Sequence, residues 1–352
     1  MRMVSYLIIV CLIGLTVFPA SSAQSEQRVK IEDAIGRTVE VSENVDSIVS
    51  LNPDVTRILI ALGAGDKLVG VEKTAMGCPV VNKVFPAIGD LSDVGSIAGG
   101  TLSLEKIATL NPDIVFISSL YPDTVSKIQQ DLGIPCVCTR GSARNVDDYL
   151  KDIHVVGMAI GKKDEAEDLV GVIRDEMNRI NETASTIPVD QRKRVLYIGP
   201  PFTKDFNRVI YNRHLCVYTA GGINVAFTSE NVSGAVGPWR TVSLEQIVEW
   251  DPDIIFIHGL SLINPEDVIT NTDWKNLKAV REGQVYKVFA VSTGYDPAML
   301  VLATMQMAKI MYPEKFDFDF HEWAEQVCQE IYGDAGRGLP EYMESKYGIS
   351  RV

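Results

Sequence analysis

Aromatic, cationic and amide side chains follow several of the predicted strands, where they could contact a bound ligand. In open α/β sheets ligands bind beyond the carboxyl ends of the strands, so these positions are the first candidates for a binding site. The candidates are Asn52, Tyr121, Arg140, Tyr211, Trp239, Arg240, His258 and Tyr295. Trp239 and Arg240 are the strongest pair, because they lie in a glycine-rich loop just before a predicted helix. The structural alternatives are a packing tryptophan, an exposed arginine and a structural histidine.

These residue types favour binding over catalysis. The sequence holds no nucleophile elbow, phosphate-binding loop or HExxH motif, so we predict no catalytic residues. A free metal ion needs a cluster of histidines and carboxylates, whereas the four histidines are scattered without paired spacing. Cys136 and Cys138 share one face of a predicted strand, but no further cysteine or histidine completes a zinc set. We predict two small buried residues there and no metal ligands.

One stretch occurs twice and indicates how these residues are positioned. Residues 101 to 117 read TLSLEKIATLNPDIVFI, and residues 241 to 257 read TVSLEQIVEWDPDIIFI. Ten of the 17 aligned positions are identical. Two blocks this similar, 140 residues apart, predict two similar halves.

Each block predicts a short helix followed by a buried strand. Ser103 and Ser243 can cap a helix, and Glu105 and Glu245 then fall in its first turn, where negative charge suits the helix dipole. A proline within the Asn-Pro-Asp or Asp-Pro-Asp sequence ends each helix. The continuous apolar runs that follow are typical of buried parallel strands. Each half is therefore predicted to be an α/β unit.

Length and charge limit the class of protein, and the N-terminus predicts export. Its 352 residues suffice for two domains, and a net charge of −13 argues against a nucleic-acid partner. Residues 1–23 resemble a secretory signal peptide, with a positive start, an apolar run and a small-residue cleavage site. The run is short for a spanning helix but could serve as an uncleaved anchor. We expect an exported protein, in the periplasm or on the outer face of the cytoplasmic membrane.

A long helical stretch separates the two halves. Within residues 147–186, apolar side chains recur every three or four positions after a break at Gly161. A helix of more than 20 residues is roughly 30 Å long, so it could serve as a strut between the halves. The alternative is an ordinary surface helix of the second half. Residues 336–352 are polar and are expected to form a loosely held tail.

The order of these motifs resembles one known family, the substrate-binding proteins of ABC importers for iron–siderophore, haem and cobalamin. The resemblance rests on DAIGRTVEV, on SIVSLNPDVTRILIALGAGDKLVGV, on both repeat blocks and on the helix between them. It covers nearly all of residues 28–333. It implies an α/β fold of two similar lobes, with central, mainly parallel sheets, joined by one long helix. The lobes would span residues 28–146 and 187–335.

The resemblance also implies a ligand and a partner. A metal chelate, most simply a ferric siderophore or else haem or cobalamin, would lie between the lobes, and no intrinsic cofactor is expected. Flat apolar faces and forked donors suit chelates with carboxylate or catecholate groups. Glu105 and Glu245 match the surface glutamates, one per lobe, that dock the family onto the dimeric permease with its ATPase. The protein itself would be a monomer.

Three other functions stay open. A protein that binds a free metal ion lacks the necessary histidine cluster, and an oxyanion such as molybdate is a further possible ligand. Chelatases also have two α/β halves, but a secretory signal fits poorly with an enzyme of tetrapyrrole synthesis.

Overall fold

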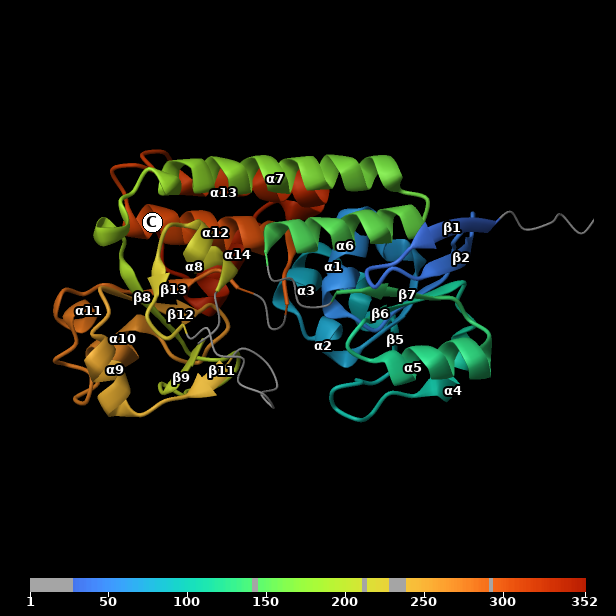
Figure 1. The fold of residues 1–352 in the computed structure, drawn as a ribbon, viewed down its shortest axis with the longest axis horizontal. Helices are drawn as coiled ribbons and strands as arrows, with labels where there is room; N and C mark the ends of the chain where they lie inside the picture. Colours follow the sequence, from blue (N-terminus) through green and yellow to red (C-terminus); the bar gives the residue numbers. More distant parts are fainter. Residues whose placement is uncertain (1–27, 141–144, 211–213, 228–238, 291–293) are drawn as a thin grey trace, which may run out of the picture.

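The computed structural model describes residues 28–140, 145–210, 214–227, 239–290 and 294–352, which form two α/β lobes side by side along the long axis (Figure 1). Each lobe has its own sheet, and no strand is shared between the two sheets of the described residues. Two lobes of this class were predicted from the repeat and from the family resemblance, and the fold prediction is confirmed.

The N-terminal lobe has a five-stranded parallel sheet in the order β5-β4-β3-β6-β7. Its strands are β3 (Ile48–Ser50), β4 (Leu68–Val71), β5 (Ser92–Asp93), β6 (Ile114–Ser118) and β7 (Cys136–Thr139). Its helices are α1 (Pro53–Ala61), α2 (Lys73–Met76), α3 (Pro79–Val84), α4 (Leu104–Leu110) and α5 (Pro122–Lys127). An antiparallel hairpin, β1 (Arg28–Glu32) and β2 (Thr38–Ser42), precedes the sheet.

The C-terminal lobe has a mixed sheet in the order β11-β9-β8-β12-β13, with β10 beside β8. Its strands are β8 (Arg194–Ile198), β9 (Arg208–Ile210), β10 (Ile223–Asn224), β11 (Trp239–Thr241), β12 (Ile254–His258) and β13 (Val285–Val288). β9 pairs antiparallel with β8 and with β11, whereas the other strand pairs of this sheet in the described residues are parallel. The helices are α8 (Leu215–Thr219), α9 (Leu244–Trp250), α10 (Pro265–Ile269), α11 (Lys278–Arg281), α12 (Pro297–Met311), α13 (Phe320–Tyr332) and α14 (Leu339–Tyr347).

The two repeat blocks fold alike. Ser103 accepts a hydrogen bond from the amide of Lys106 and Ser243 from the amide of Gln246, both at 3.2 Å, so each serine caps its helix as predicted. Helices α4 and α9 end at Asn111 and Asp251, which have the left-handed φ values of 43° and 33°. Such a residue ends a helix and turns the chain directly into the following strand, β6 or β12.

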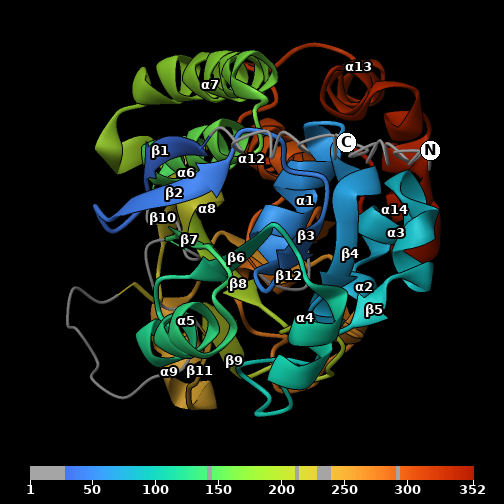
Figure 2. The same ribbon diagram turned by 90° about the vertical axis from the view of Figure 1, so that its right-hand side faces the viewer.

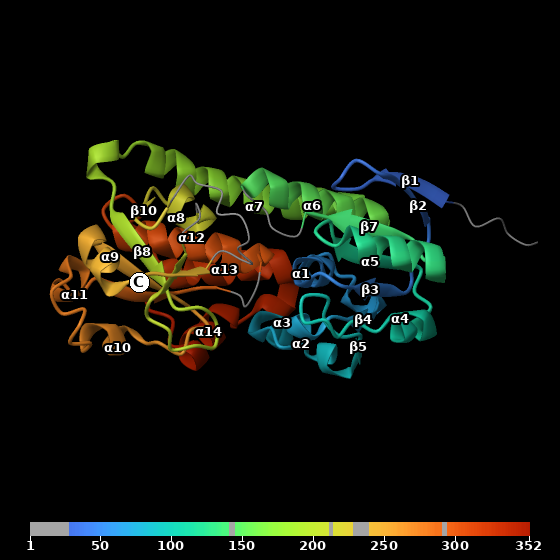
Figure 3. The ribbon, with the colours of Figure 1, turned by 60° about the horizontal axis from the view of Figure 1, so that its bottom comes forward.

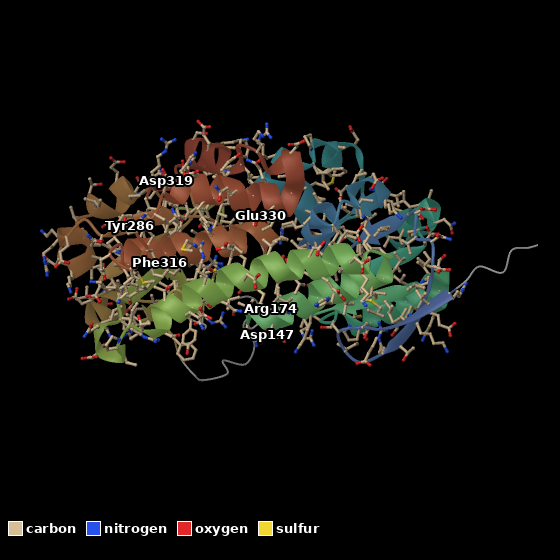
Figure 4. All side chains as sticks on the ribbon, turned by 90° about the horizontal axis from the view of Figure 1, so that it is seen from above. Asp147, Arg174, Tyr286, Phe316, Asp319 and Glu330 are labelled. Atoms are coloured by element: carbon tan, nitrogen blue, oxygen red, sulfur yellow. The ribbon has the colours of Figure 1, made fainter. Side chains whose placement is uncertain are left out.

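Helices α6 (Val146–Ala159) and α7 (Lys163–Ser185) follow the first sheet, and α7 carries the chain across to the second lobe. Seen from above, α7 spans both lobes, with Arg174 near the middle of its length (Figure 4). The predicted apolar stripe is buried at Ala166, Leu169, Val170, Ile173, Met177 and Ile180. The indole nitrogen of Trp323 in α13 donates to Glu176 of α7 at 3.2 Å. Helices α7 and α13 lie on the same side of the molecule, away from α4 and α5 (Figure 2).

The prediction of a loosely held tail is wrong. Leu339 and Met343 of α14 are fully buried, and α14 packs against α13 and against α3 of the other lobe (Figure 3). Beyond the helix, the amide of Ser350 donates to the carbonyl oxygen of Lys287 in β13 at 2.8 Å. The apolar positions of α14 are few and lie between polar residues. The composition therefore did not indicate this helix, which is stabilised by tertiary contacts.

All five cysteines of the described residues are free thiols and are buried: Cys78, Cys136, Cys138, Cys216 and Cys328. Burial raises the pKa of Cys136 to about 12 and that of Cys138 to about 11. Cys136 and Cys138 are thus small core residues, as predicted. The described residues contain no cluster of three or more His, Cys, Asp or Glu side chains suited to a metal ion.

Candidate functional site

An aromatic cluster lies near the carboxyl ends of β8 and β12. The rings of Trp239 and His258, which were predicted, are 5.9 Å apart, and Tyr197 of β8 lies 6.1 Å and 6.2 Å from them. His214 stacks on Tyr197 at 4.6 Å. Four rings from separate segments therefore form one cluster, in which Tyr197 and His258 are buried and Trp239 and His214 are half-buried.

In both histidines of this aromatic cluster, Nδ1 accepts a hydrogen bond from a backbone amide, so this nitrogen is not free to bind a metal ion. Nδ1 of His258 accepts from the amide of Leu260 at 3.1 Å, so the neutral ring carries its proton on Nε2. Nδ1 of His214 accepts from the amide of Val217 at 3.5 Å and caps α8. Burial lowers the pKa of His214 to about 4, which keeps its ring uncharged at neutral pH. The cluster is therefore suited to an apolar or aromatic face rather than to an anion alone.

Arg240 follows Trp239 in β11, and alternation along the strand sends its side chain to the opposite face. Its Nη1 donates to the carbonyl oxygen of Trp239 at 3.0 Å, and the residue is half-buried. The pair predicted from the sequence is therefore split between two faces of one strand. Trp239 alone joins the aromatic cluster. Tyr211 lies outside the described residues.

In the N-terminal lobe, two predicted contacts have structural partners. Asn52 is only 4% exposed, accepts from the amide of Asp54 at 3.0 Å and donates to Thr139 at 2.9 Å. It caps α1 and ties it to β7. Arg140 is half-buried and pairs with Asp148 at 3.6 Å and Asp152 at 3.7 Å. Its charge is thus already compensated within the lobe.

Tyr121 and Tyr295 are the predicted tyrosines that the structure describes. Tyr121 is half-buried against the core of the N-terminal lobe, just before α5. Tyr295 precedes α12 of the C-terminal lobe, yet its ring lies 5.8 Å from that of Tyr149 in α6. Burial is the main cause of the raised pKa of Tyr197, and Cys216 and Tyr295 add to it. Tyr295 therefore lies close to α6 although it belongs to the C-terminal lobe.

Large apolar side chains are exposed on the loops that follow the strands. Phe202 after β8 is 53% exposed and Leu262 after β12 is 52% exposed. Their loops are paired, since the amide of Phe202 donates to Leu260 at 2.8 Å and that of Leu262 to Thr203 at 2.9 Å. Leu120, after β6 of the other lobe, is 65% exposed. Phe202 has φ 59°, a left-handed conformation that is uncommon for a bulky residue and is often found at binding sites.

Glu105 and Glu245 are both exposed, in the first turns of α4 and α9. These helices lie on the same side of the molecule, toward its opposite ends (Figure 1). Hydrogen bonds from its own amide and from the Ser243 hydroxyl lower the pKa of Glu245. The two carboxylates are therefore separate surface charges, in equivalent places on the two lobes.

The lobes, the sheets and the repeat agree with one protein family. Residues 48–290 match the family described as periplasmic binding protein. The chain belongs to this family. Bacillus subtilis YvrC, described as an uncharacterized ABC transporter substrate-binding lipoprotein, is 27% identical over 293 residues, covering 82% of this chain and 87% of YvrC.

Two further relatives carry ligand names. The molybdate-binding protein MolA of Haemophilus influenzae is 24% identical over 351 residues, covering 93% of this chain and 95% of MolA. The molybdate-bound structure of MolA has a TM-score of 0.73 at 22% identity, covering 86% of this chain and 98% of that one. The Fe(3+)-citrate-binding protein YfmC of Bacillus subtilis is 25% identical over 292 residues, covering 80% of this chain and 87% of YfmC.

Membership in the family of ABC substrate-binding proteins confirms the resemblance found in the sequence, and members of this family bind solutes for transport. None of the helices in the described residues is both long and apolar enough to span a membrane. Two residues of the aromatic cluster, Tyr197 and His214, were not predicted. Tyr197 lies one position before the end of its strand, which is the only local signal for it. His214 is a lone histidine, and its contact with Tyr197 depends on the tertiary fold and not on a local sequence pattern.

Proposed function

We propose that this chain is the solute-capturing component of an ABC importer for a chelated metal, held between its two lobes. A ferric siderophore is the first candidate, and haem or cobalamin is the next. The aromatic cluster of Tyr197, His214, Trp239 and His258 carries the proposal, because the half-buried Trp239 offers an aromatic ring to a ligand with an apolar face and is packed at 49° and 63° against Tyr197 and His258. The exposed Phe202, Leu262 and Leu120 support it.

The alternative ligand is an oxyanion. Similarity to MolA along most of both chains favours it. A small anion needs several donors held close together, as in other anion sites. Arg140 is already paired with two carboxylates, and Arg240 points away from the aromatic face, so the described residues give less support to an oxyanion than to a chelate.

A titration separates these ligands. Purified protein would be titrated with a ferric catecholate siderophore, ferric citrate, haem, cobalamin and molybdate while tryptophan fluorescence is measured. We expect one of the chelates to quench the signal. Trp239→Phe should remove most of the quenching and weaken binding about tenfold, the equivalent of about 1.4 kcal/mol. Trp250→Phe in α9 is the matched control and should change neither. Binding of molybdate alone would refute the chelate, and binding of none of these ligands would refute the proposed function.

Glu105 and Glu245 complete the proposal as docking residues. Each would meet a cationic residue on one half of a dimeric permease, which is driven by its ATPase, while the binding protein itself acts as a monomer. The support is their exposure on equivalent helices of the two lobes. Residues 1–23, which lie outside the described residues, would direct export to the periplasm or to the outer face of the cytoplasmic membrane, with or without remaining as an anchor.

A further inference from the structure

Residues 294–296 of the C-terminal lobe press against helix α1 of the N-terminal lobe. A Cβ atom placed on Gly294 would lie only 1.7 Å from Oδ1 of Asp54, which is far inside van der Waals contact. The backbone amide of the next residue, Tyr295, lies beside the same carboxylate. Only a glycine therefore permits the two lobes to approach this closely at this point.

Arg57 joins the same two segments. Its guanidinium is buried, donates through Nη2 to Oδ1 of Asp54 at 2.7 Å, and donates through Nε to the carbonyl oxygen of Tyr295 at 2.9 Å. One bond stays within α1, and the other crosses to the C-terminal lobe. Because the guanidinium is planar, the two bonds together fix the position of the Tyr295 backbone relative to α1.

A second buried carboxylate holds the other end of the segment. Asp296 accepts from the amides of Ala298 and Met299 at 3.0 Å and 2.9 Å, and so caps α12. Its Oδ2 accepts from the hydroxyl of Tyr332 in α13 at 2.6 Å. Residues 294–296 are thus anchored to α1 on one side and to α12 and α13 on the other.

Tyr295 is the residue that this arrangement orients. Its ring lies against Tyr149 of α6, whose hydroxyl is buried and has no hydrogen-bond partner among the described residues. A buried hydroxyl without a partner is unfavourable by about 1–3 kcal/mol, so the surrounding contacts must hold Tyr149 in place. The contact of Tyr149 with Tyr295 is therefore imposed by the packing of the lobes.

We infer that Arg57, with Asp54 and Gly294, is a positioning residue for ligand capture, which holds Tyr295 in place and keeps the two lobes in one binding-competent arrangement. The role of Arg57 in ligand capture rests on the proposed function. Arg57 itself need not touch the ligand. It acts by keeping the cleft preformed, so that binding does not require the lobes to be ordered first.

Two glycine variants test this inference. Gly294→Ala places a methyl group against Asp54, whereas Gly283→Ala has open space around it, and the two glycines share a similar φ of 63° and 68°. Both variants therefore carry the same backbone strain, and only the first disturbs the contact between lobes. We expect Gly294→Ala to bind the chelate about tenfold more weakly, through slower association, if only about a tenth of the molecules stay competent. Gly283→Ala should bind like the wild type.

A double variant tests whether the contact itself transmits the effect. Removing the carboxylate in Asp54→Ala should relieve the Gly294→Ala clash, so the double variant should bind more tightly than the two single effects combined predict, by at least about threefold. Additive effects would overturn the inference, as would equal binding by Gly294→Ala and Gly283→Ala.

The same cycle is measured without ligand, as thermal unfolding midpoints of the four proteins. Non-additive midpoints support the contact between lobes, and additive midpoints refute it, whether or not a ligand is known. A wild type that binds neither chelate nor molybdate would refute the proposed function and the role of Arg57 in capture. If the wild type binds a chelate but the variants show neither weaker binding nor non-additive effects, this inference alone is refuted.

Discussion

At the scale of single residues, Asp54 is a buried carboxylate at the contact between the lobes. Burial raises its pKa to about 7, although Arg57 and the amide of Tyr295 oppose the shift. The groups that face it are Arg57 of α1, Tyr149 and Asp152 of α6, and Tyr295 and Asp296 before α12, with Cys78 beyond the guanidinium. The proton is therefore held more tightly in the folded protein than in the unfolded chain.

This shift predicts how stability depends on pH. The folded pKa lies above the unfolded value near 4, so the contribution of Asp54 is fully present below pH 4 and is lost as the pH rises to about 7. Asp54→Asn should remove this loss. The free energy of unfolding of the variant relative to the wild type should rise across pH 4–7 by up to about 1.4 kcal/mol per pH unit, the slope for one proton, and then level off.

Denaturant unfolding at a series of pH values measures this difference. A flat difference between Asp54→Asn and the wild type would contradict a raised pKa for Asp54.

The candidate binding residues show how far prediction reaches at this scale. Trp239 and His258 were selected because they adjoin strand ends, and they do meet in one aromatic cluster. Asn52 and Arg140 were selected by the same rule, but their side chains serve a helix cap and two ion pairs. Arg57 was not selected, because it lies inside a helix, and its partner Tyr295 is 238 residues further along the chain. Local patterns do not carry information on contacts of that kind.

At the scale of elements, the repeat was the most informative part of the sequence. It predicted α4 and α9 with their serine caps because capping and proline are local signals. The apolar stripe of α7 was equally clear. The antiparallel β9 and the helix α14 were missed. Both are short, and both are stabilised by contacts with residues distant in sequence. Neither residue propensity nor hydrophobic periodicity predicts such contacts.

Helix α14 gives a prediction of its own. Met343 is fully buried where α14 packs between α13 and α3, so Met343→Ala should lower the free energy of unfolding by about 2–5 kcal/mol. Ser345→Ala, on the exposed face of the same helix, should change it by no more than about 0.5 kcal/mol. Urea unfolding of both variants provides the measurement. Equal stabilities would mean that the helix is not docked in solution.

At the scale of the whole molecule, the described residues connect the two lobes at several places. Helix α7 crosses between them, residues 294–296 meet α1, and α14 meets α3. With so many contacts, the described structure favours small movements of one lobe against the other, and the spacing between α4 and α9 should change little on binding. A fixed spacing is what a partner with two equivalent contact points requires.

The proposed docking role is tested at this scale. Glu105→Arg combined with Glu245→Arg should abolish ligand uptake by cells and leave the affinity for the ligand unchanged, because neither residue belongs to the aromatic cluster. The matched control is Glu167→Arg with Glu330→Arg, which makes the same change in net charge on the opposite side, on α7 and α13. Retained uptake by the first pair, or loss of affinity, would contradict docking. Since exposed charges are screened, the interaction should also weaken with added salt.

The five buried thiols make movements of one lobe against the other convenient to measure. Since Cys78, Cys136, Cys138, Cys216 and Cys328 are all inaccessible, a protein that begins after the proposed signal peptide should react slowly with thiol-specific dyes. One cysteine introduced on the exposed surface of each lobe would then be the preferred attachment point for a fluorophore. The distance between lobes could be followed by energy transfer without replacing any native cysteine.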